Sequence, residues 1–359
     1  MTGRVEHDPV PGRGMKVGVI GLGGVSRFHF AGYRAGGAEV VAVSDLSQEA
    51  IQRAQDEWLV PRGYQDYHSL LADAEVEAVS VCLPNALHHP VTVAAARAGK
   101  HVLCEKPLSL SLERAGEMID ACREAGVTLQ TGHHLRTNPY AERARQLVES
   151  GALGRLTYLR LRQAHDWGGL RTVRPSFGSL ASAGGGTLLD NGSHMMDLAR
   201  YFGGDVREVF ARTATLGFEV EVEDTAVVSL EFASGALGIV ENAWTATGWE
   251  EGFWLYGTRG ALEYTNRSGT PELRHVFRDS PGTTWDKADH ATYHFAGLEA
   301  HARGVVAFLA AIRGEREVVC TGEDGLEAVR LIGASYQSAR SGRPVTLPTS
   351  GERAGPGRG

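Results

Sequence analysis

The chain has 359 residues, 42% of them hydrophobic and 22% charged, and 36 basic against 43 acidic residues give a net charge of −7. This length predicts about two domains, and the residue balance excludes a disordered or fibrous protein. An acidic surface repels phosphate backbones and anionic lipid, and no apolar run reaches transmembrane length. We therefore expect neither nucleic acid nor a membrane as partner.

The first residues and the cysteines bear on the compartment. Residues 1–14 carry charges and two prolines but no apolar stretch, so we expect a flexible tail and no secretory signal. The cysteines lack the C-x-x-C spacing of metal or redox sites, which leaves a reducing compartment, the cytoplasm, as the expectation. They are Cys82, Cys104, Cys122 and Cys320.

Between residues 15 and 133, short apolar runs alternate with helical patterns. This alternation is typical of βαβ units and predicts a doubly wound parallel sheet, a Rossmann domain. Strands are expected at 16–20, 39–44, 78–83, 101–104 and 127–131, and helices at 26–36, 50–58, 90–98 and 112–125.

Beyond residue 133 strands dominate, which predicts a second, α+β domain with a large, mostly antiparallel sheet. We expect this domain to span 134–325, followed by a helix and end segment at 326–345 and a flexible tail at 346–359. Its strands are expected at 155–164, 206–214, 225–232, 236–244 and 253–256, and helices at 138–150, 189–202, 298–312 and 326–341.

A glycine-rich turn, Gly21-Leu22-Gly23-Gly24-Val25-Ser26, joins the first expected strand to the first helix. Glycines let the backbone approach a pyrophosphate, and the helix N-terminus supplies N–H donors. A strand before and a helix after the turn are the context that a dinucleotide site requires. We expect Gly21, Gly23, Gly24 and Val25 to contact the cofactor.

Asp45 ends the second strand, where a carboxylate hydrogen-bonds the adenosine ribose of NAD and repels the 2′-phosphate of NADP. NAD is therefore the expected cofactor. The alternative is that Asp45 caps the helix that begins near Gln48.

Glu105 and Lys106 follow the fourth of these strands, and ligands of such sheets bind at the carboxyl ends of the strands. We expect both side chains at the mouth of the crevice. Taken alone, Lys106 is also consistent with an ordinary solvated lysine.

Glu105-Lys106-Pro107, behind the glycine turn, resembles the glucose–fructose oxidoreductase / inositol dehydrogenase / rhizopine-catabolism (Gfo/Idh/MocA) family. The resemblance implies an NAD-dependent oxidoreductase that acts on a secondary alcohol or ketone of a sugar, sugar derivative or inositol-like cyclitol. It also implies a homodimer or homotetramer. The resemblance extends to residues 184–194 and 321–325. It also includes the loop residues Leu83, Pro84, Asn85 and His88, and it places this loop along the nicotinamide ribose.

The same resemblance implies that Lys106, Asp190 and His194 are catalytic. Asp190 and His194 share one face of a helix, and alcohol oxidation needs a base such as histidine, oriented by a carboxylate. An ammonium group stabilises a developing alkoxide. By spacing alone, Asp190 as a helix cap and His194 as a core histidine are favoured. Asp197 supplies no third ligand at metal spacing, so no metal is expected.

The expected substrate contacts add four residues to Lys106 and His194. The family resemblance suggests a basic residue near the crevice, for which Arg136 is the match, and Asn191 lies in the 184–194 signature. His165 and Trp167 combine a polar group with an aromatic face, as sugar sites do, although Trp167 is equally consistent with core.

Two other functions are compatible with these residues. One is a glycoside-cleaving enzyme in which bound NAD assists by transient oxidation. The other is a regulator that binds NAD without turnover, although such a protein has no need for Lys106, Asp190 and His194.

Overall fold

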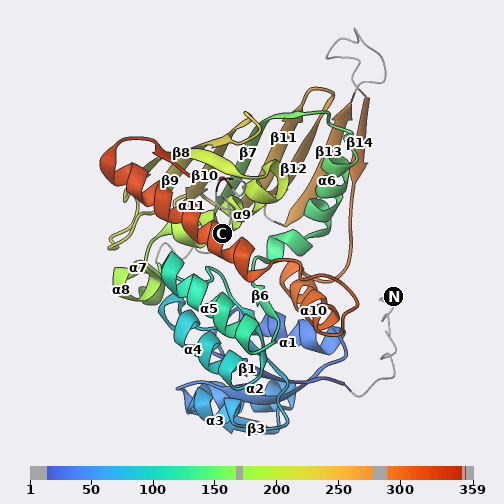
Figure 1. The fold of residues 1–359 in the computed structure, drawn as a ribbon, viewed down its shortest axis with the longest axis vertical. Helices are drawn as coiled ribbons and strands as arrows, with labels where there is room; N and C mark the ends of the chain where they lie inside the picture. The colour runs from blue at the N-terminus through green and yellow to red at the C-terminus, as the bar shows by residue number, and fades with distance from the viewer. Residues whose placement is uncertain (1–13, 167–172, 268, 278–288, 350–351, 353–359) are drawn as a thin grey trace, which may run out of the picture.

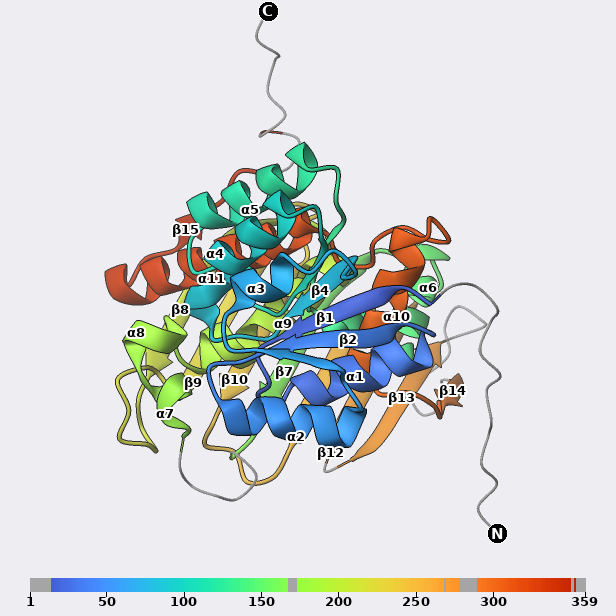
Figure 2. The same ribbon diagram turned by 90° about the horizontal axis from the view of Figure 1, so that it is seen from below.

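The computed structural model describes residues 14–166, 173–267, 269–277, 289–349 and 352. In this part of the chain, a six-stranded parallel sheet of order β3-β2-β1-β4-β5-β6 forms the first domain (Figure 1). Apart from the edge strand β3, its strands are mostly buried because helices cover both faces, with α1 and α2 on one side and α3, α4 and α5 on the other (Figure 2). The strands are β1 (Lys16–Ile20), β2 (Glu39–Ser44), β3 (Arg62–Tyr64), β4 (Ala78–Val81), β5 (His101–Cys104) and β6 (Leu129–Thr131). The helices are α1 (Ser26–Ala35), α2 (Gln48–Trp58), α3 (Tyr67–Leu71), α4 (Asn85–Arg97) and α5 (Leu112–Glu124).

Helix α4 begins at Asn85, five residues before the predicted start at Pro90. Proline is favoured in the first turn of a helix, because it lacks an N–H donor, and is costly further along. Pro90 instead lies inside the helix on its exposed side. The earlier start brings Asn85 to the carboxyl edge of the sheet.

A nine-stranded sheet of order β14-β13-β12-β11-β7-β10-β9-β8-β15 forms the second domain within the described residues. It is the mostly antiparallel sheet that was predicted, with β7 and β10 as a parallel pair. Its strands are β7 (Leu156–Ala164), β8 (Val206–Ala214), β9 (Thr225–Phe232), β10 (Leu237–Ala243), β11 (Glu250–Gly257), β12 (Gly260–Arg267), β13 (Thr270–Phe277), β14 (Asp289–Tyr293) and β15 (Val345–Thr346). The helical segments between Gly132 and Gly204 are η1 (His134–Thr137), α6 (Pro139–Glu149), α7 (Pro175–Gly178), α8 (Leu180–Ala183) and α9 (Thr187–Gly203).

The last two helices, α10 (Ala300–Ile312) and α11 (Gly322–Ser341), tie the domains together. We assigned 134–325 to the second domain, but Val305, Phe308 and Leu309 of α10 pack into the core of the first. Helix α11 contacts both α5 and α9, and so bridges the domains. No helix in the described segments is long and apolar enough to cross a membrane.

The tail predicted at 346–359 begins later than expected. Thr346 pairs with Glu208 of β8, and Leu347 is buried with its amide bonded to the Arg207 carbonyl. Of the predicted tails, residues 1–13, 350–351 and 353–359 lie outside the described residues.

Candidate active site

The turn between β1 and α1 forms one end of the site. Gly21 has φ +90°, and a Cβ there would lie 2.4 Å from the carbonyl oxygen of Cys82. A Cβ on Gly23 would meet nothing within 4 Å. Ser26 Oγ donates to the Gly23 carbonyl at 2.7 Å and closes the turn. The fold therefore requires glycine at position 21, whereas the bare backbone at Gly23 faces open space.

A cavity of ≈ 990 Å³ opens over this turn, between the two domains. Leu22, Gly23, Gly24 and Val25 line it, and the first turn of α1 holds no acidic residue. The free amides and positive dipole end of a helix N-terminus favour an anion. The turn thus fits the pyrophosphate of a dinucleotide.

Asp45 is tied to the glycine turn and does not cap α2. Its Oδ2 accepts from Leu22 N at 2.8 Å and its Oδ1 from Ser47 N at 2.9 Å. The cap of α2 is Ser47, whose side chain accepts from Ala50 N. The capping interpretation of Asp45 is therefore wrong. Each of its oxygens keeps acceptor capacity, as a ribose contact requires.

The loop after β4 reaches the cavity at two of its four predicted positions. Leu83 and Asn85 line the cavity, and Asn85 Nδ2 also donates to a carbonyl of α8 at 2.8 Å. Pro84 precedes α4 at its N-cap position and is not part of the lining. His88 is fully buried and its ring bonds the carbonyls of Leu83 and Pro107, each at 2.8 Å. His88 therefore positions two loops and does not face the cofactor.

Glu105 at the end of β5 is buried and bonds His29 Nε2 at 3.0 Å. Burial raises the pKa of this carboxyl, but the hydrogen bond from His29 and the charges of His301 and Lys106 outweigh it. The pKa is lowered to about 2. Glu105 Oε2 also accepts the backbone N–H of Lys106 at 3.2 Å, so this carboxylate fixes the loop that presents the lysine.

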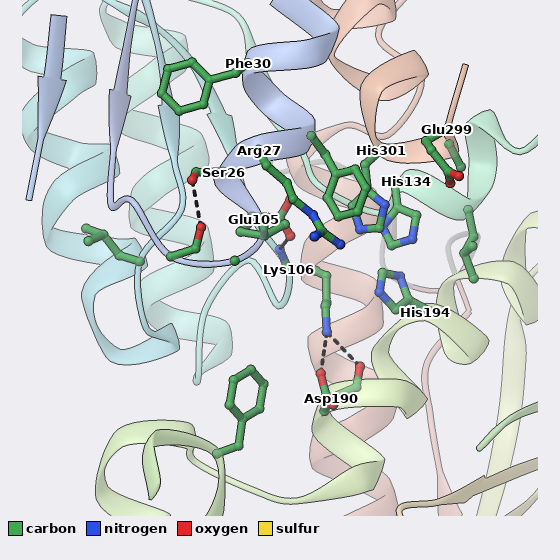
Figure 3. Close-up of a pocket in the computed structure, with 18 of the residues that line it drawn as sticks. Ser26, Arg27, Phe30, Glu105, Lys106, His134, Asp190, His194, Glu299 and His301 are labelled. Atoms are coloured by element: carbon green, nitrogen blue, oxygen red, sulfur yellow. Dashed lines mark hydrogen bonds and ion pairs between the residues drawn. The ribbon is translucent and has the colours of Figure 1, made fainter. Parts of the chain in front are cut away.

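Lys106 and Asp190 form an ion pair across the domain boundary (Figure 3). Lys106 Nζ lies 2.7 Å from Asp190 Oδ1 and 3.0 Å from the Asp190 carbonyl oxygen. Trp244 Nε1 donates to the other carboxylate oxygen at 3.3 Å. Both charged side chains line the cavity, and Lys106 is not an ordinary solvated lysine.

His194 lies one turn after Asp190 on α9 and lines the same cavity. The expected bond between the two is absent among the described contacts: Asp190 bonds Lys106 and Trp244, and His194 Nδ1 has no partner. The His194 ring instead packs edge-on against His134, with centroids 4.5 Å apart. Burial lowers the pKa of His194 well below its usual value, and the charges of His134 and Lys106 lower it further. The imidazole is neutral at pH 7 and suited to accept a proton.

The N-terminus of α9 is capped by a residue far along the chain. The Glu223 carboxylate accepts from Gly186 N at 3.1 Å and Leu188 N at 2.9 Å, and from Tyr336 OH at 2.9 Å. The interpretation of Asp190 as the cap is therefore wrong. With Glu223 in that role, Asp190 is available to Lys106.

Arg136 does not reach the cavity. The residue is 6% exposed, and its guanidinium bonds Asp197 and Asp324 at 2.7 and 2.9 Å, and the Val319 carbonyl at 3.2 Å. These partners occupy the guanidinium donors in a buried ion cluster, and Arg136 is therefore not a substrate contact. No group of three or more His, Cys, Asp or Glu in the described segments has the geometry to hold a metal ion.

His165 and Asn191 meet at the cavity wall, where His165 Nε2 lies 3.2 Å from Asn191 Oδ1. The His165 ring stacks on Trp249 with centroids 5.4 Å apart and an interplanar angle of 2°. Trp249 therefore provides an aromatic face that the sequence analysis missed. Trp167 lies outside the described residues.

Further lining residues were also missed. His134 and His301 stack with centroids 3.3 Å apart, and they come from the two ends of the second domain's sequence. Gln163 and Glu251 lie opposite each other on β7 and β11. For these two the sequence held a signal, because each is polar at a position where strand alternation calls for an apolar residue.

A parallel sheet with a glycine turn and an interdomain cavity at its carboxyl edge defines a dinucleotide-binding oxidoreductase. The family model described as "Oxidoreductase family, NAD-binding Rossmann fold" matches residues 15–133, and the GFO/IDH/MocA C-terminal domain matches residues 141–263. The chain belongs to the GFO/IDH/MocA family of oxidoreductases, and its cofactor is NAD.

Named relatives match over nearly the full length. Myo-inositol 2-dehydrogenase of Thermotoga maritima is 32% identical over 93% of this chain and 98% of its own. The 1,5-anhydro-D-fructose reductase of Ensifer adhaerens is 35% identical over 92% and 98%. A levoglucosan dehydrogenase solved with NADH and levoglucosan superposes with a TM-score of 0.85 at 25% identity, covering 94% of this chain and all of that one.

Proposed function

We propose that the protein is an NAD-dependent dehydrogenase or reductase that interconverts a secondary alcohol and a ketone on a sugar, sugar derivative or cyclitol. One observation carries the proposal: the Lys106–Asp190 pair and the neutral His194 line the cavity that opens over the glycine turn. The relatives named above support the substrate class, since they act on myo-inositol and on an anhydro sugar.

The roles of the three residues follow from their charge states. Bound NAD would supply the acceptor for a hydride that leaves the alcohol carbon. His194 takes the hydroxyl proton, because its ring is neutral at pH 7. The Lys106 ammonium donates to the same oxygen and stabilises the negative charge that develops there. Asp190 holds Lys106 in place at 2.7 Å and serves as its positioning residue.

The remaining contacts are assigned by their position. The amides of Gly23, Gly24 and Val25 hold the pyrophosphate, and Asp45 binds the adenosine ribose and disfavours NADP. Leu83 and Asn85 flank the nicotinamide half. A separate wall formed by His165, Asn191 and Trp249 contacts the substrate through hydrogen bonds and one aromatic face.

The test is NADH formation, followed by absorbance, with a panel of free sugars, anhydro sugars and inositols. We expect turnover with at least one member. A parallel assay offers glycosides without added NAD, and bond cleavage there with no net NADH would replace the proposal by redox-assisted hydrolysis. Tight NAD binding with no turnover of any panel member would favour a regulatory role.

We further propose a homodimer or homotetramer in the cytoplasm. Leu237, Tyr158 and Tyr256 lie side by side on β10, β7 and β11 and are exposed on the outer face of the large sheet. An apolar row of this kind suits a contact between copies. Light scattering should give a mass above that of one chain, and Tyr158→Glu should lower it. The four cysteines are free and buried, as is usual in a reducing compartment.

A further inference from the structure

The large sheet changes character along one line across four neighbouring strands. Asn242, Gln163, Glu251 and Asn266 lie in register on β10, β7, β11 and β12, and share one face of the sheet. The residues two positions away on the same face belong to the apolar core: Val240, Leu161, Phe253 and Tyr264. The core therefore ends at this polar row. Three of its members, Gln163, Glu251 and Asn266, line the interdomain cavity.

Glu251 is the unusual member of the row, because it is a carboxylate without a cation. It is 8% exposed, and accepts from Gln163 Nε2 at 2.8 Å and Tyr264 OH at 3.3 Å. No ion pair to Glu251 occurs in the described part of the chain. A buried charge without a counter-ion is destabilising, so its retention at a cavity wall indicates a role toward a ligand.

The surroundings of Glu251 offer acceptors and further negative charge. Glu299, which precedes α10 and also lines the cavity, interacts electrostatically with Glu251, and burial followed by this neighbour raises the pKa of the Glu251 carboxyl. Asn266 Oδ1 is buried and has no hydrogen-bond partner among the described residues. In Figure 3 Glu299 lies well apart from Asp190, with His134 and His194 between them. Glu299 is thus set apart from the Lys106–Asp190 pair.

We propose that Glu251, assisted by Glu299 and Asn266, determines specificity for the end of the substrate that is remote from the reacting carbon. A wall of acceptors binds hydrogen-bond donors, namely hydroxyls or a protonated amine. When the Glu251 carboxyl is ionised, this wall rejects a carboxylate or phosphate, which brings acceptors and a like charge. Because the pKa of Glu251 is raised, this rejection should weaken as the pH is lowered. The inference rests on the proposed function, and narrows its substrates to neutral or amine-bearing polyols, with sugar acids and sugar phosphates excluded.

The experiment compares three sugars that differ at one carbon: D-glucose, 6-amino-6-deoxy-D-glucose and D-glucuronate. Each is measured for kcat/KM with NAD, or for competitive inhibition against the best panel substrate where it is not turned over. For the native protein we expect the amine to match or exceed glucose, and glucuronate to be weaker by about tenfold or more, as like-charge contacts require. In Glu251→Gln, which preserves shape, the glucuronate penalty should shrink to about threefold or less.

Two further variants keep the result interpretable. Glu250→Gln changes the adjacent residue, which points to the opposite face and pairs with Arg162, and should leave the ratio of glucuronate to glucose unchanged. Glu299→Gln, at an exposed position, should shrink the penalty partly without risk to folding. An unchanged ratio in folded Glu251→Gln and Glu299→Gln overturns this inference while the panel result stands. Failure of the whole panel with the native protein overturns the proposed function instead.

Discussion

The two ends of the interdomain cavity are built in different ways. The cofactor end is mostly backbone: the glycine turn, the amides of α1 and one carboxylate, all within about thirty residues of sequence. The substrate end is made of side chains from β7, α9, the β11–β12 hairpin and α10, which are spread over more than a hundred residues of sequence. The first end is fixed by conformation, and the second can change its chemistry without altering the fold.

The largest effect is expected at His194. His194→Ala should lower kcat by roughly 10²–10⁴-fold, the usual contribution of a positioned base. Because burial and nearby charge lower the His194 pKa, oxidation by the native protein should fall only as pH drops well below 6.5. The variant should lose this acidic limb. Tm and kcat are measured on the same sample. A lower Tm with unchanged kcat and an intact limb would restore the interpretation of His194 as a core histidine.

Lys106→Ala should reduce kcat by about 10²-fold or more, as for the loss of one charge donor to the transition state. NAD affinity, measured by fluorescence titration, should change little, because the pyrophosphate and ribose contacts remain. Lys16→Ala is the matched control, since Lys16 pairs with Glu75 on the surface of the first domain. Near-normal turnover of Lys106→Ala would leave the lysine a purely structural partner of Asp190.

At the cofactor end, the expected effect is on binding and not on chemistry. Gly23→Ala should raise the Kd for NAD by about tenfold, equivalent to about 1.4 kcal/mol, because the methyl group occupies the pyrophosphate position. Its Tm should stay near the native value, since a Cβ at this site meets no protein atom. Gly116→Ala on α5, equally uncrowded, should leave the Kd unchanged. Unaltered NAD affinity in Gly23→Ala would remove the turn from the cofactor site.

The smallest effect concerns the choice between two cofactors. Asp45→Ser combined with Leu46→Arg should shift the ratio of kcat/KM toward NADP by about tenfold, because it replaces a repelling carboxylate by a cation. Leu46 is 87% exposed, so the arginine enters without disturbing the core. A native protein that already works better with NADP would contradict the assignment of Asp45.

The parts of the site that could be predicted from the sequence are those formed by local contacts. The turn at Gly21 to Ser26 follows from adjacent residues, and its strand, helix and open glycine were predictable. The ion pair of Asp190 was not predictable, because its partner Lys106 lies 84 residues earlier in the chain. It also depends on Glu223, which lies beyond α9 in the sequence and caps the N-terminus of that helix. Helix geometry predicted that Asp190 would bond His194, but in the folded protein Asp190 bonds Lys106 and Trp244 instead.

For Arg136 and Glu251, too, the position of the side chain depends on residues distant in sequence. The sequence suggested a site role for Arg136 that the fold does not support, and it did not reveal the role of Glu251. Arg136 was expected at the substrate because the family resemblance suggests a basic residue there, yet two acidic residues distant in sequence bind it. Glu251 interrupts an alternating strand, a visible signal, but its place beside Gln163 of β7 depends on strand register. Register across non-adjacent strands is set by the assembled core and is not readable from one segment.

Helix α10 constrains how this protein can be recombined. A chimera that kept residues 15–133 and took the rest of its chain from a relative would pack α1 against the α10 of that relative. Gly32 of α1 and Gly36, which follows its last residue, contact the native helix so closely that a Cβ would lie 2.5 Å from Val305 or Leu309, respectively. Specificity should therefore be exchanged by grafting β7, β11 and β12 positions into the intact chain. Swapping the sequence at residue 133 would instead separate two helices that pack this closely.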